Sequence, residues 1–326
     1  MNPNKNLSVV SGLVAATLLL PCATLLAADY HSVAEIPVGG AGGFDYLTVD
    51  AANRHLFVSH GTKVVVIDIE KNKVIGEVTD TPGVHGIAIA PALKKGFTTN
   101  GREAKASIFD LNTFKTLSKV ETGANPDALL FEASLNEVYT FNGRGQSATV
   151  FDADSGKVKA TIPLSGKPET GVADSKAGRI YLNLENKNVV TVIDTKTRKV
   201  VTDWPIAPGE EASGMAIDLE HHRLFIGAHN KLMIMMDSET GKVVGSVPIG
   251  EDVDANAFDP ESQLAFASNA DGTVTIAHED SPGKLTVVQT LKTQKGAKTM
   301  ALDPKTHNIY LAAGSGDNFK VYVYGK

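Results

Sequence analysis

The sequence predicts an all-β protein in which one structural unit is repeated around a ring. A short apolar run recurs just before a turn, and it ends at Asp50, Ala90, Glu132, Asp174, Asp218, Asp259 and Asp303. An aromatic residue stands seven positions after each end, namely Phe57, Phe97, Tyr139, Tyr181, Phe225, Phe266 and Tyr310. Two further β-rich runs complete each repeat. Seven repeats of 40 to 44 residues predict a seven-bladed β-propeller with four-stranded blades, because one such sheet cannot bury both faces alone.

The composition suits one domain with a large core. The chain has 326 residues, of which 42% are hydrophobic and 21% are charged. The repeats fill residues 29–326, so we expect a single propeller domain there, with the recurring aromatic residues filling the wedges between blades. Acidic residues outnumber basic ones by 37 to 31, and such a surface attracts no phosphate backbone over long range. Nucleic acid is therefore an unfavoured partner.

Residues 1–28 differ from the rest and are predicted to be a secretory signal peptide. Lys5 precedes an apolar run over residues 9–26, and two small residues then mark a cleavage site near Ala28. Two alternatives stay open, an uncleaved membrane anchor and lipid attachment at Cys22. Cys22 is the only cysteine, so the mature chain has no disulfide. We expect a periplasmic or secreted protein with no membrane span after signal removal.

The strands follow the same order in every repeat. In the first repeat we expect an inner strand at residues 44–50, a returning strand at 54–60 and two outer strands at 64–68 and 74–78. Residues 30–38 look like the fourth strand of a repeat but precede every first strand, while the last repeat supplies only three strands. The N-terminal strand is therefore predicted to complete the last blade, which closes the ring and removes free sheet edges.

The turn between the third and fourth strands has a chemistry that can be read from the sequence. Asp152 and Asp237 each precede a glycine by four residues. The acid can accept hydrogen bonds from nearby backbone N–H groups, and the glycine adopts a positive φ without strain. Asn72 suits the same place. Phe114 and Arg198 do not, so we expect those two turns to be built differently.

Short motifs in the second strands resemble those of a known repeat family. Tyr139-Thr140-Phe141-Asn142 and its counterparts look like the YVTN repeat, and residues 30–326 resemble the secreted, seven-bladed YncE-like propellers. The resemblance implies a binding or surface protein and, for some members, affinity for single-stranded DNA. A single tryptophan, Trp204, and the lack of a repeated Trp-Asp ending argue against the WD40 class.

A ring of polar residues is predicted at one mouth of the central channel. The loops before the first strands and after the second strands emerge at the same end of such sheets, where binding residues commonly lie. Five positions before each inner-strand end stand Asp45, His85, Asp127, Glu169, Ser213, Asp254 and Lys298. The residues that follow them are mostly small, as expected where inner strands crowd an axis.

The candidate ligand-binding residues come from this ring and from the adjoining loops. They are Asp45, His60, His85, Arg102, Asp127, Arg144, Glu169, Glu211, His229, Asp254 and Lys298. Arginine forks suit a carboxylate or a phosphate. Carboxylates with a histidine suit a divalent metal, but no H-x-H or H-E-x-x-H spacing is present, so no metal ligand is named and the cofactor stays unknown. His221-His222 is interpreted as an exposed turn. In the competing interpretation, the mouth residues only solvate strand ends and cap loops.

The leading functional hypothesis is a monomeric propeller that binds a small molecule or a protein through this face without catalysis. The alternative is a lactonase-like hydrolase or lyase, in which His85 or His229 acts with Glu169 as acid and base. No nucleophile motif such as G-x-S-x-G supports catalysis. Single-stranded DNA binding is a minor alternative, because the basic residues are scattered among more numerous acids.

Overall fold

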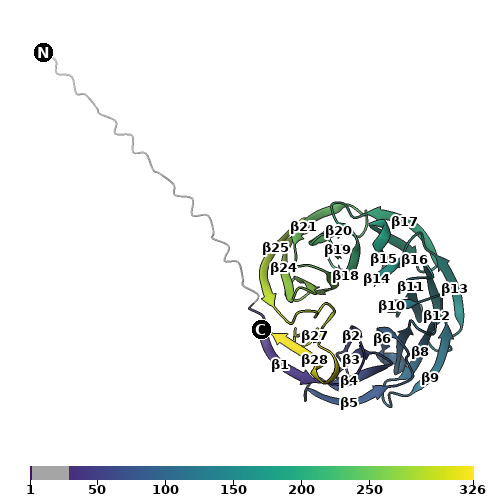
Figure 1. Cartoon of the computed structure of the whole chain (residues 1–326). Helices are drawn as coiled ribbons and strands as arrows, with labels where there is room; N and C mark the ends of the chain where they lie inside the picture. The colour runs from purple at the N-terminus through teal and green to yellow at the C-terminus, as the bar shows by residue number, and fades with distance from the viewer. Residues whose placement is uncertain (2–28) are drawn as a thin grey trace.

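The protein is a seven-bladed β-propeller, as the repeats predict (Figure 1). The computed structural model describes Met1 and residues 29–326, and the predicted signal peptide lies outside that part of the chain. Within the described residues, seven four-stranded antiparallel sheets surround a central axis. No helix in this part of the chain has the length and apolar character needed to cross a membrane.

The blades are numbered in chain order, and each begins with its inner strand. Blade 1 contains β2 (Phe44–Asp50), β3 (His55–His60), β4 (Lys63–Asp68) and β5 (Lys73–Val78). Blade 2 contains β6 (Val84–Ala90), β7 (Lys95–Asn100), β8 (Lys105–Asp110) and β9 (Thr116–Glu121). Blade 3 contains β10 (Pro126–Glu132), β11 (Glu137–Asn142), β12 (Ser147–Asp152) and β13 (Val158–Pro163). Blade 4 contains β14 (Pro168–Asp174), β15 (Arg179–Leu184), β16 (Val189–Asp194) and β17 (Lys199–Pro205). Blade 5 contains β18 (Ala212–Asp218), β19 (Arg223–Ala228), β20 (Leu232–Asp237) and β21 (Val243–Pro248).

Blade 6 contains β22 (Val253–Asp259), β23 (Leu264–Asn269), β24 (Thr273–Ser281) and β25 (Lys284–Lys292). Blade 7 contains β26 (Met300–Leu302), β27 (Ile309–Ala313), β28 (Lys320–Gly325) and β1 (His31–Pro37). Three short 3-10 helices lie in connections of the described chain: η1 (Pro91–Leu93), η2 (Glu185–Lys187) and η3 (Gly316–Asn318).

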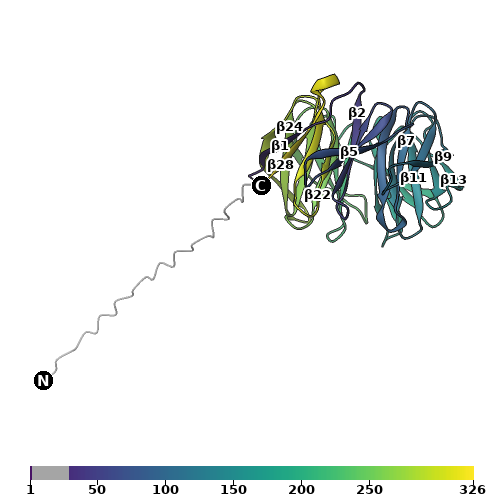
Figure 2. The same ribbon diagram turned by 90° about the horizontal axis from the view of Figure 1, so that it is seen from below.

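The N-terminal strand closes the ring, as predicted. β1 pairs antiparallel with β28, with His31 opposite Gly325 and Pro37 opposite Lys320, so it is the outer strand of blade 7. In Figure 1, β1 in purple lies beside β28 in yellow. Figure 2 shows the blades side by side, with their strands running between the two faces of the ring. The inner strand β2 contacts both β6 and β26, which makes the ring continuous.

The hydrophobic core is divided into seven wedges in the described chain, each between two neighbouring blades. Between blades 3 and 4, for example, Tyr139 and Phe141 pack with Ile180 and Leu182. All seven recurring aromatic residues are buried, so their predicted core role is confirmed. Each wedge takes side chains from two blades, and therefore a blade depends on its neighbours for burial.

The expectation that the turns at Phe114 and Arg198 differ from the others is wrong. Phe114 and Arg198 adopt left-handed φ values of 59° and 54°, close to the 72° of Gly156. Their N–H groups donate to the carbonyls of Asp110 and Asp194, as that of Gly156 does to Asp152. A left-handed residue with a side chain carries a backbone strain of about 1–2 kcal/mol.

Tertiary contacts offset this strain at both positions. The ring of Phe114 packs edge-on against His55 and Phe57 at centroid distances of 5.9 and 6.2 Å. Arg198 pairs with the buried carboxylate of Glu137 in the neighbouring blade. Local turn preference is therefore overridden by packing between blades, which the sequence of the turn does not show.

Candidate functional site

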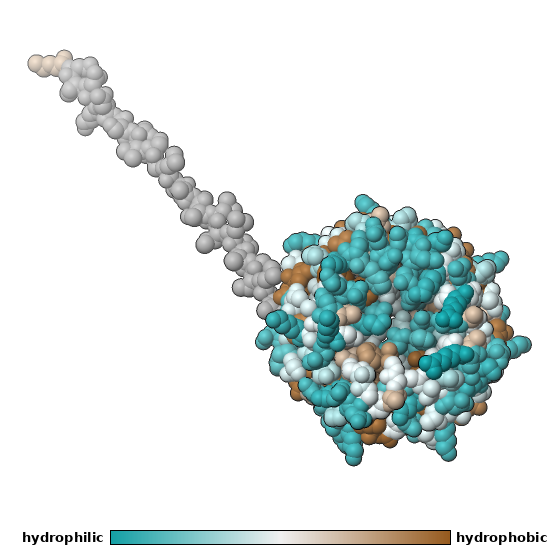
Figure 3. Space-filling model, viewed as in Figure 1, coloured by the Kyte–Doolittle hydropathy of each residue, from teal (hydrophilic) through white to brown (hydrophobic). Residues whose placement is uncertain are grey.

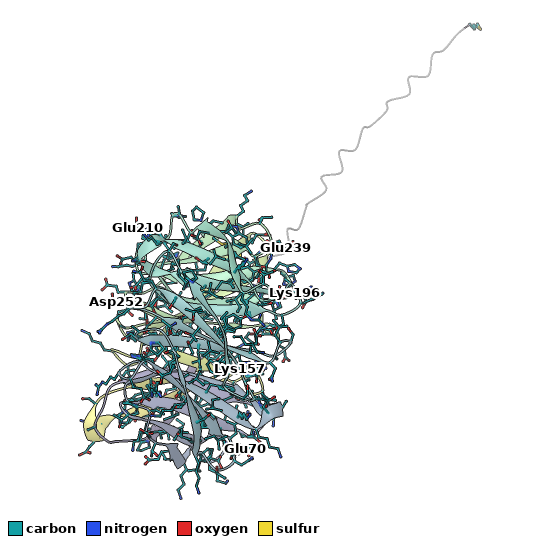
Figure 4. The ribbon with its side chains drawn as sticks, turned by 90° about the vertical axis from the view of Figure 1, so that its right-hand side faces the viewer. Glu70, Lys157, Lys196, Glu210, Glu239 and Asp252 are labelled. Atoms are coloured by element: carbon teal, nitrogen blue, oxygen red, sulfur yellow. The ribbon has the colours of Figure 1, made fainter. Side chains whose placement is uncertain are left out.

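The two faces of the ring carry different connections. The mouth face, defined here by the loops before the inner strands and after the second strands, includes Glu210 and Asp252. The turn face, defined by the turns after the inner and third strands, includes Lys196 and Glu239. Figure 4 shows these two pairs at opposite ends of the blades. Figure 3 looks onto the mouth face and shows hydrophilic side chains around a central hollow.

The structure brings the predicted polar ring together at the mouth. In six of the seven inner strands of the described chain, the register against the second strand shifts at the ring residue, as between Phe44 and Leu47 of β2. Such a β-bulge releases backbone groups from the ladder and redirects a side chain. Hydroxyl groups accept two of the released N–H groups: Ser59 accepts from Asp45 at 2.8 Å and Thr99 accepts from Gly86 at 2.8 Å.

His85 lies between two carboxylates of the ring. Its Nδ1 is 2.7 Å from Asp45 Oδ2 and 3.7 Å from Asp127 Oδ1. The hydrogen bond to Asp45 is the largest influence on the His85 pKa, and this pKa is raised although burial opposes the shift. One ligand atom from each of Asp45, His85 and Asp127 lies within 4.8 Å of the others, so these three residues could also hold a metal ion.

Two lysines neutralise the remaining carboxylates of the ring. Lys167 Nζ lies 2.5 Å from both Glu169 Oε1 and Glu185 Oε2. Lys298 Nζ lies 2.6 Å from Asp254 Oδ2, and Ser213 donates to Asp254 Oδ1 at 2.9 Å. These ion pairs relieve only part of the like-charge repulsion expected from four ring carboxylates, because the charge of Asp45 still raises the pKa of Asp127.

Burial raises the pKa values of two ring carboxylates, Asp127 and Glu169. Burial, and then the charge of Asp45, raises the pKa of Asp127 to about 6. Burial and the charge of Asp127 also raise the pKa of Glu169. Burial alone would raise the pKa of Glu185, but its hydrogen bond with Lys167 holds that pKa below the ordinary value. Lys167 lies at the same distance from both carboxylates and therefore shares its charge between Glu185 and Glu169.

Tyr46 reaches across the axis from blade 1 to blade 4. It extends from β2 of blade 1 and packs against the hydrophobic wedge between blades 3 and 4. Its hydroxyl lies 3.4 Å from Thr170 Oγ1 in β14. Burial, followed by the charges of Asp127 and Asp45, raises the Tyr46 pKa well above its ordinary range. The side chain is therefore a neutral phenol next to the polar residues of the ring.

Two cavities lie at the mouth and share Asp45. The larger has a volume of about 560 Å³ and is lined by His85, Arg102, Asn125 and Arg144, with glycines along its edge. The smaller, of about 260 Å³, is lined by the lysine and carboxylate groups and by His229. Arg54, Arg198 and Arg223 each pair with a carboxylate, whereas no ion pair joins Arg102 or Arg144 to any described residue. The larger cavity therefore presents two unneutralised guanidinium groups.

Three of the predicted residues lie away from the centre of the ring. His60 is 1% exposed and stacks on Phe319 with ring centroids 4.3 Å apart, so it packs in the interior and lines neither cavity. Glu211 lies at the rim, where its carboxylate is 3.8 Å from His229 Nδ1. The other ring nitrogen of His229 lies 3.1 Å from the carbonyl oxygen of Val253, which fixes the ring at the edge of the smaller cavity.

Two important mouth residues were missed by sequence reasoning. Lys167 stands two positions before the ring residue Glu169, in the loop that leads into β14, and could have been found by reading each ring residue together with its preceding loop. Tyr46 is the one large residue at a position that holds glycine, alanine or threonine in the other repeats. Its size was a signal that this side chain reaches across the axis.

The raised pKa of Asp127 predicts that replacing its carboxylate with an uncharged amide stabilises the fold, by an amount that depends on pH. A carboxyl group with a pKa near 6 when folded and near 4 when unfolded destabilises the fold increasingly as the pH rises through that interval. Asp127→Asn should therefore be more stable than the wild type at pH 7.5, by up to about 3 kcal/mol, and no more stable at pH 4. Thermal melts at both pH values, with the exposed Asp252→Asn on the same face as control, measure this. A lower melting temperature of Asp127→Asn at pH 7.5 would show that the carboxylate is needed to hold His85.

Comparisons with known proteins support the propeller fold and do not identify a family or a function. No family model matches the chain, and no curated protein matches it. Among solved structures, a chain of the hydrazine synthase of Kuenenia stuttgartiensis is similar, with a TM-score of 0.76 over 87% of this chain and 96% of that chain. The two sequences are 16% identical. At this identity the likeness shows the propeller fold alone.

Proposed function

We propose that this propeller binds a small organic anion at the mouth face. The observation that carries the proposal is the larger cavity, where Arg102 and Arg144 have no acidic partner among the described residues, whereas the basic groups of the neighbouring ring are each paired with a carboxylate. Planar guanidinium groups bind carboxylate or phosphate oxygens through paired hydrogen bonds. His85 lines the same cavity, but it is paired with Asp45 and lies near Asp127, so the two arginines are the groups left to bind an anion.

The shape of the site supports a bound ligand of limited size. A cavity of about 560 Å³ falls within the range of small-molecule sites. The shared wall at Asp45 offers acceptors for hydroxyl or ammonium groups at the other end of the ligand. A polar metabolite with one anionic group therefore fits this site better than a long polymer.

Catalysis is the second candidate, and the Asp45–His85 pair is the observation that favours it. An aspartate that orients a histidine is a common arrangement for acid–base chemistry. A general base, however, must be unprotonated, whereas the hydrogen bond to Asp45 raises the pKa of His85 and favours its cationic form. The same geometry suits anion binding at neutral pH, so we place binding first.

Removal of the two arginines should abolish anion binding without unfolding the protein. We expect wild type to show a thermal shift with at least one probe of a panel made of citrate, succinate and inorganic phosphate. Arg102→Gln combined with Arg144→Gln should weaken the response at least about tenfold, because a charge-assisted hydrogen bond contributes about 1.5–3 kcal/mol. Lys196→Gln, on the turn face, is the control. An unchanged response in the double variant would assign anion binding to another surface.

The proposal includes export, and the resemblance to YncE-like propellers supports it. The leader-like residues 1–28 and the YVTN-like motif at residues 139–142 are the sequence features on which it depends. We expect the exported protein to begin near Asp29, as measured by its intact mass. A full-length mass in the membrane fraction would favour an anchor, and a diacylglyceryl addition would favour lipid attachment at Cys22.

A further inference from the structure

A second cluster of metal-ligating side chains lies on the turn face, away from the mouth. Asp218 and His221 belong to the turn after the inner strand of blade 5, and Glu279 lies in β24 of blade 6. One ligand atom from each of these residues lies within 4.8 Å of the others. His221 Nδ1 is 2.6 Å from Asp218 Oδ2, so the histidine is already oriented by the carboxylate.

Glu279 is the residue that makes this cluster unusual. It is 5% exposed, and neither of its carboxylate oxygens has a hydrogen-bond partner among the described residues. A buried carboxylate without a hydrogen-bond partner is costly, so this position favours either a protonated side chain or a bound cation. A positive charge at this point would supply the missing partner.

The repeat shows that the glutamate is a local departure from the pattern of the fold. The backbone N–H of Glu279 donates to Gln263, and the same bond is made in the other complete blades by buried residues that carry no charge. These equivalent residues are Ile69, Leu111, Ala153, Thr195 and Ser238. Packing of the fold does not require a carboxylate there, because five blades form the same junction without one.

We propose that Asp218, His221 and Glu279 bind a divalent transition-metal ion that joins blades 5 and 6. Nitrogen and carboxylate ligands hold zinc at about 2.0–2.2 Å, which places ligand atoms about 3.4 Å apart around a tetrahedral ion. To reach that value, the 2.6 Å contact between His221 Nδ1 and Asp218 Oδ2 has to open, and the wider spacings within the 4.8 Å cluster have to close. The imidazole favours zinc and related ions over magnesium and calcium, which prefer oxygen ligands alone.

The surroundings leave room for the ion and for a further ligand. A cavity of about 370 Å³, lined by His221, Glu279 and Asp280, opens beside the cluster, so water can complete the coordination. The nearby guanidinium group of Arg223 is already bound to Asp237 and to the carbonyl of Pro282. Asp280 is held by His278, Thr286 and Lys284. The two carboxylates of the cluster can therefore balance the charge of a divalent ion.

Zinc titration of the purified full-length chain, after treatment with a chelator, tests the proposal. We expect calorimetry to show one zinc ion bound by these residues and the melting temperature to rise with zinc. His221→Gln and Glu279→Gln should each weaken this binding by more than the roughly 10–100-fold that the loss of an outer-shell partner causes. His222→Gln is the matched control, because it changes the adjacent histidine outside the cluster and should leave affinity unchanged.

The second His–carboxylate cluster, at the mouth, needs its own control. His85→Gln should leave binding at the turn face unchanged. The proposal is overturned if wild type binds no zinc, if the loss occurs with His85→Gln instead, or if His222→Gln weakens binding as much as His221→Gln does. His221 is partly exposed, so its substitution remains informative even if Glu279→Gln perturbs the fold. Circular dichroism of each variant establishes that it is folded.

Discussion

A chain that begins at Gly40 and therefore lacks β1 is expected to melt far below the wild type or to aggregate. β1 contributes Ile36 to the wedge between blades 7 and 1, and Tyr30 just before it packs edge-on against Phe266 of blade 6, with centroids 5.4 Å apart. Burial of each of these side chains contributes about 1.5–3 kcal/mol. The loss of the β-ladder adds to this, so the total approaches the 5–15 kcal/mol that stabilises a typical domain.

The truncation also changes how the protein behaves in solution. Without β1, the whole length of β28 becomes an exposed edge that can pair with another chain. Thermal melts and light scattering should therefore change together. A chain that begins at Asp29 keeps Tyr30 and β1, and it should melt like the full-length protein. Equal melting temperatures for the chains that begin at Asp29 and Gly40 would show that the ring does not depend on β1 for closure.

Arg54→Met is expected to produce the second large effect, at the same seam of the ring. Arg54 in blade 1 donates to both carboxylate oxygens of Asp303 in blade 7, at 3.0 and 2.7 Å. The Asp303 side chain is 0% exposed and that of Arg54 is 12% exposed. Removal of one partner of a buried ion pair costs about 3–5 kcal/mol, because the remaining charge is left in a dry environment. Chemical denaturation measures the change.

The pH dependence and a double variant identify the mechanism. Burial alone would raise the pKa of Asp303, but Arg54 and then Thr306 hold it below the ordinary value. The stabilising effect is therefore present at neutral pH and is lost as the pH falls through the low pKa of the folded state. Arg54→Met should be most harmful at neutral pH, and a second change, Asp303→Asn, should restore much of the loss. Lys63→Met, which breaks an exposed pair with Glu77, should cost less than about 1 kcal/mol.

The architecture could be predicted because it depends on patterns that repeat. A buried aromatic residue at a fixed distance from each inner strand identifies the blade. Because this pattern occurs seven times, the prediction of the fold does not depend on any single repeat. The closing strand followed from a count of strands at the two ends. The ring at the mouth could be placed by register alone, since the residues from Asp45 to Asp254 occupy equivalent positions in their blades.

Features that depend on contacts between different blades could not be read in this way. The left-handed turn at Arg198 exists because Glu137 of another blade binds its side chain. His60 is adjacent in sequence to a mouth loop, yet stacking on Phe319 draws its ring into the interior. Lys298 was placed in the ring by its register, but its 2.6 Å ion pair with Asp254 of blade 6 is visible only in the structure. Each of these contacts joins segments whose pairing is not encoded in the period of the repeat.

The pairing of β1 with β28 makes closure of the ring depend on the synthesis of all seven repeats. β1 must wait for β28, because Glu35 and its ion-pair partner Lys320 are 285 residues apart in sequence. A growing chain therefore carries an unpaired strand until β28 has been synthesised. A chain that stops early, or that loses one repeat, offers no partner in the right place. Its open edges then remain available to chaperones and proteases, so incomplete molecules are distinguished from complete ones by their backbone alone.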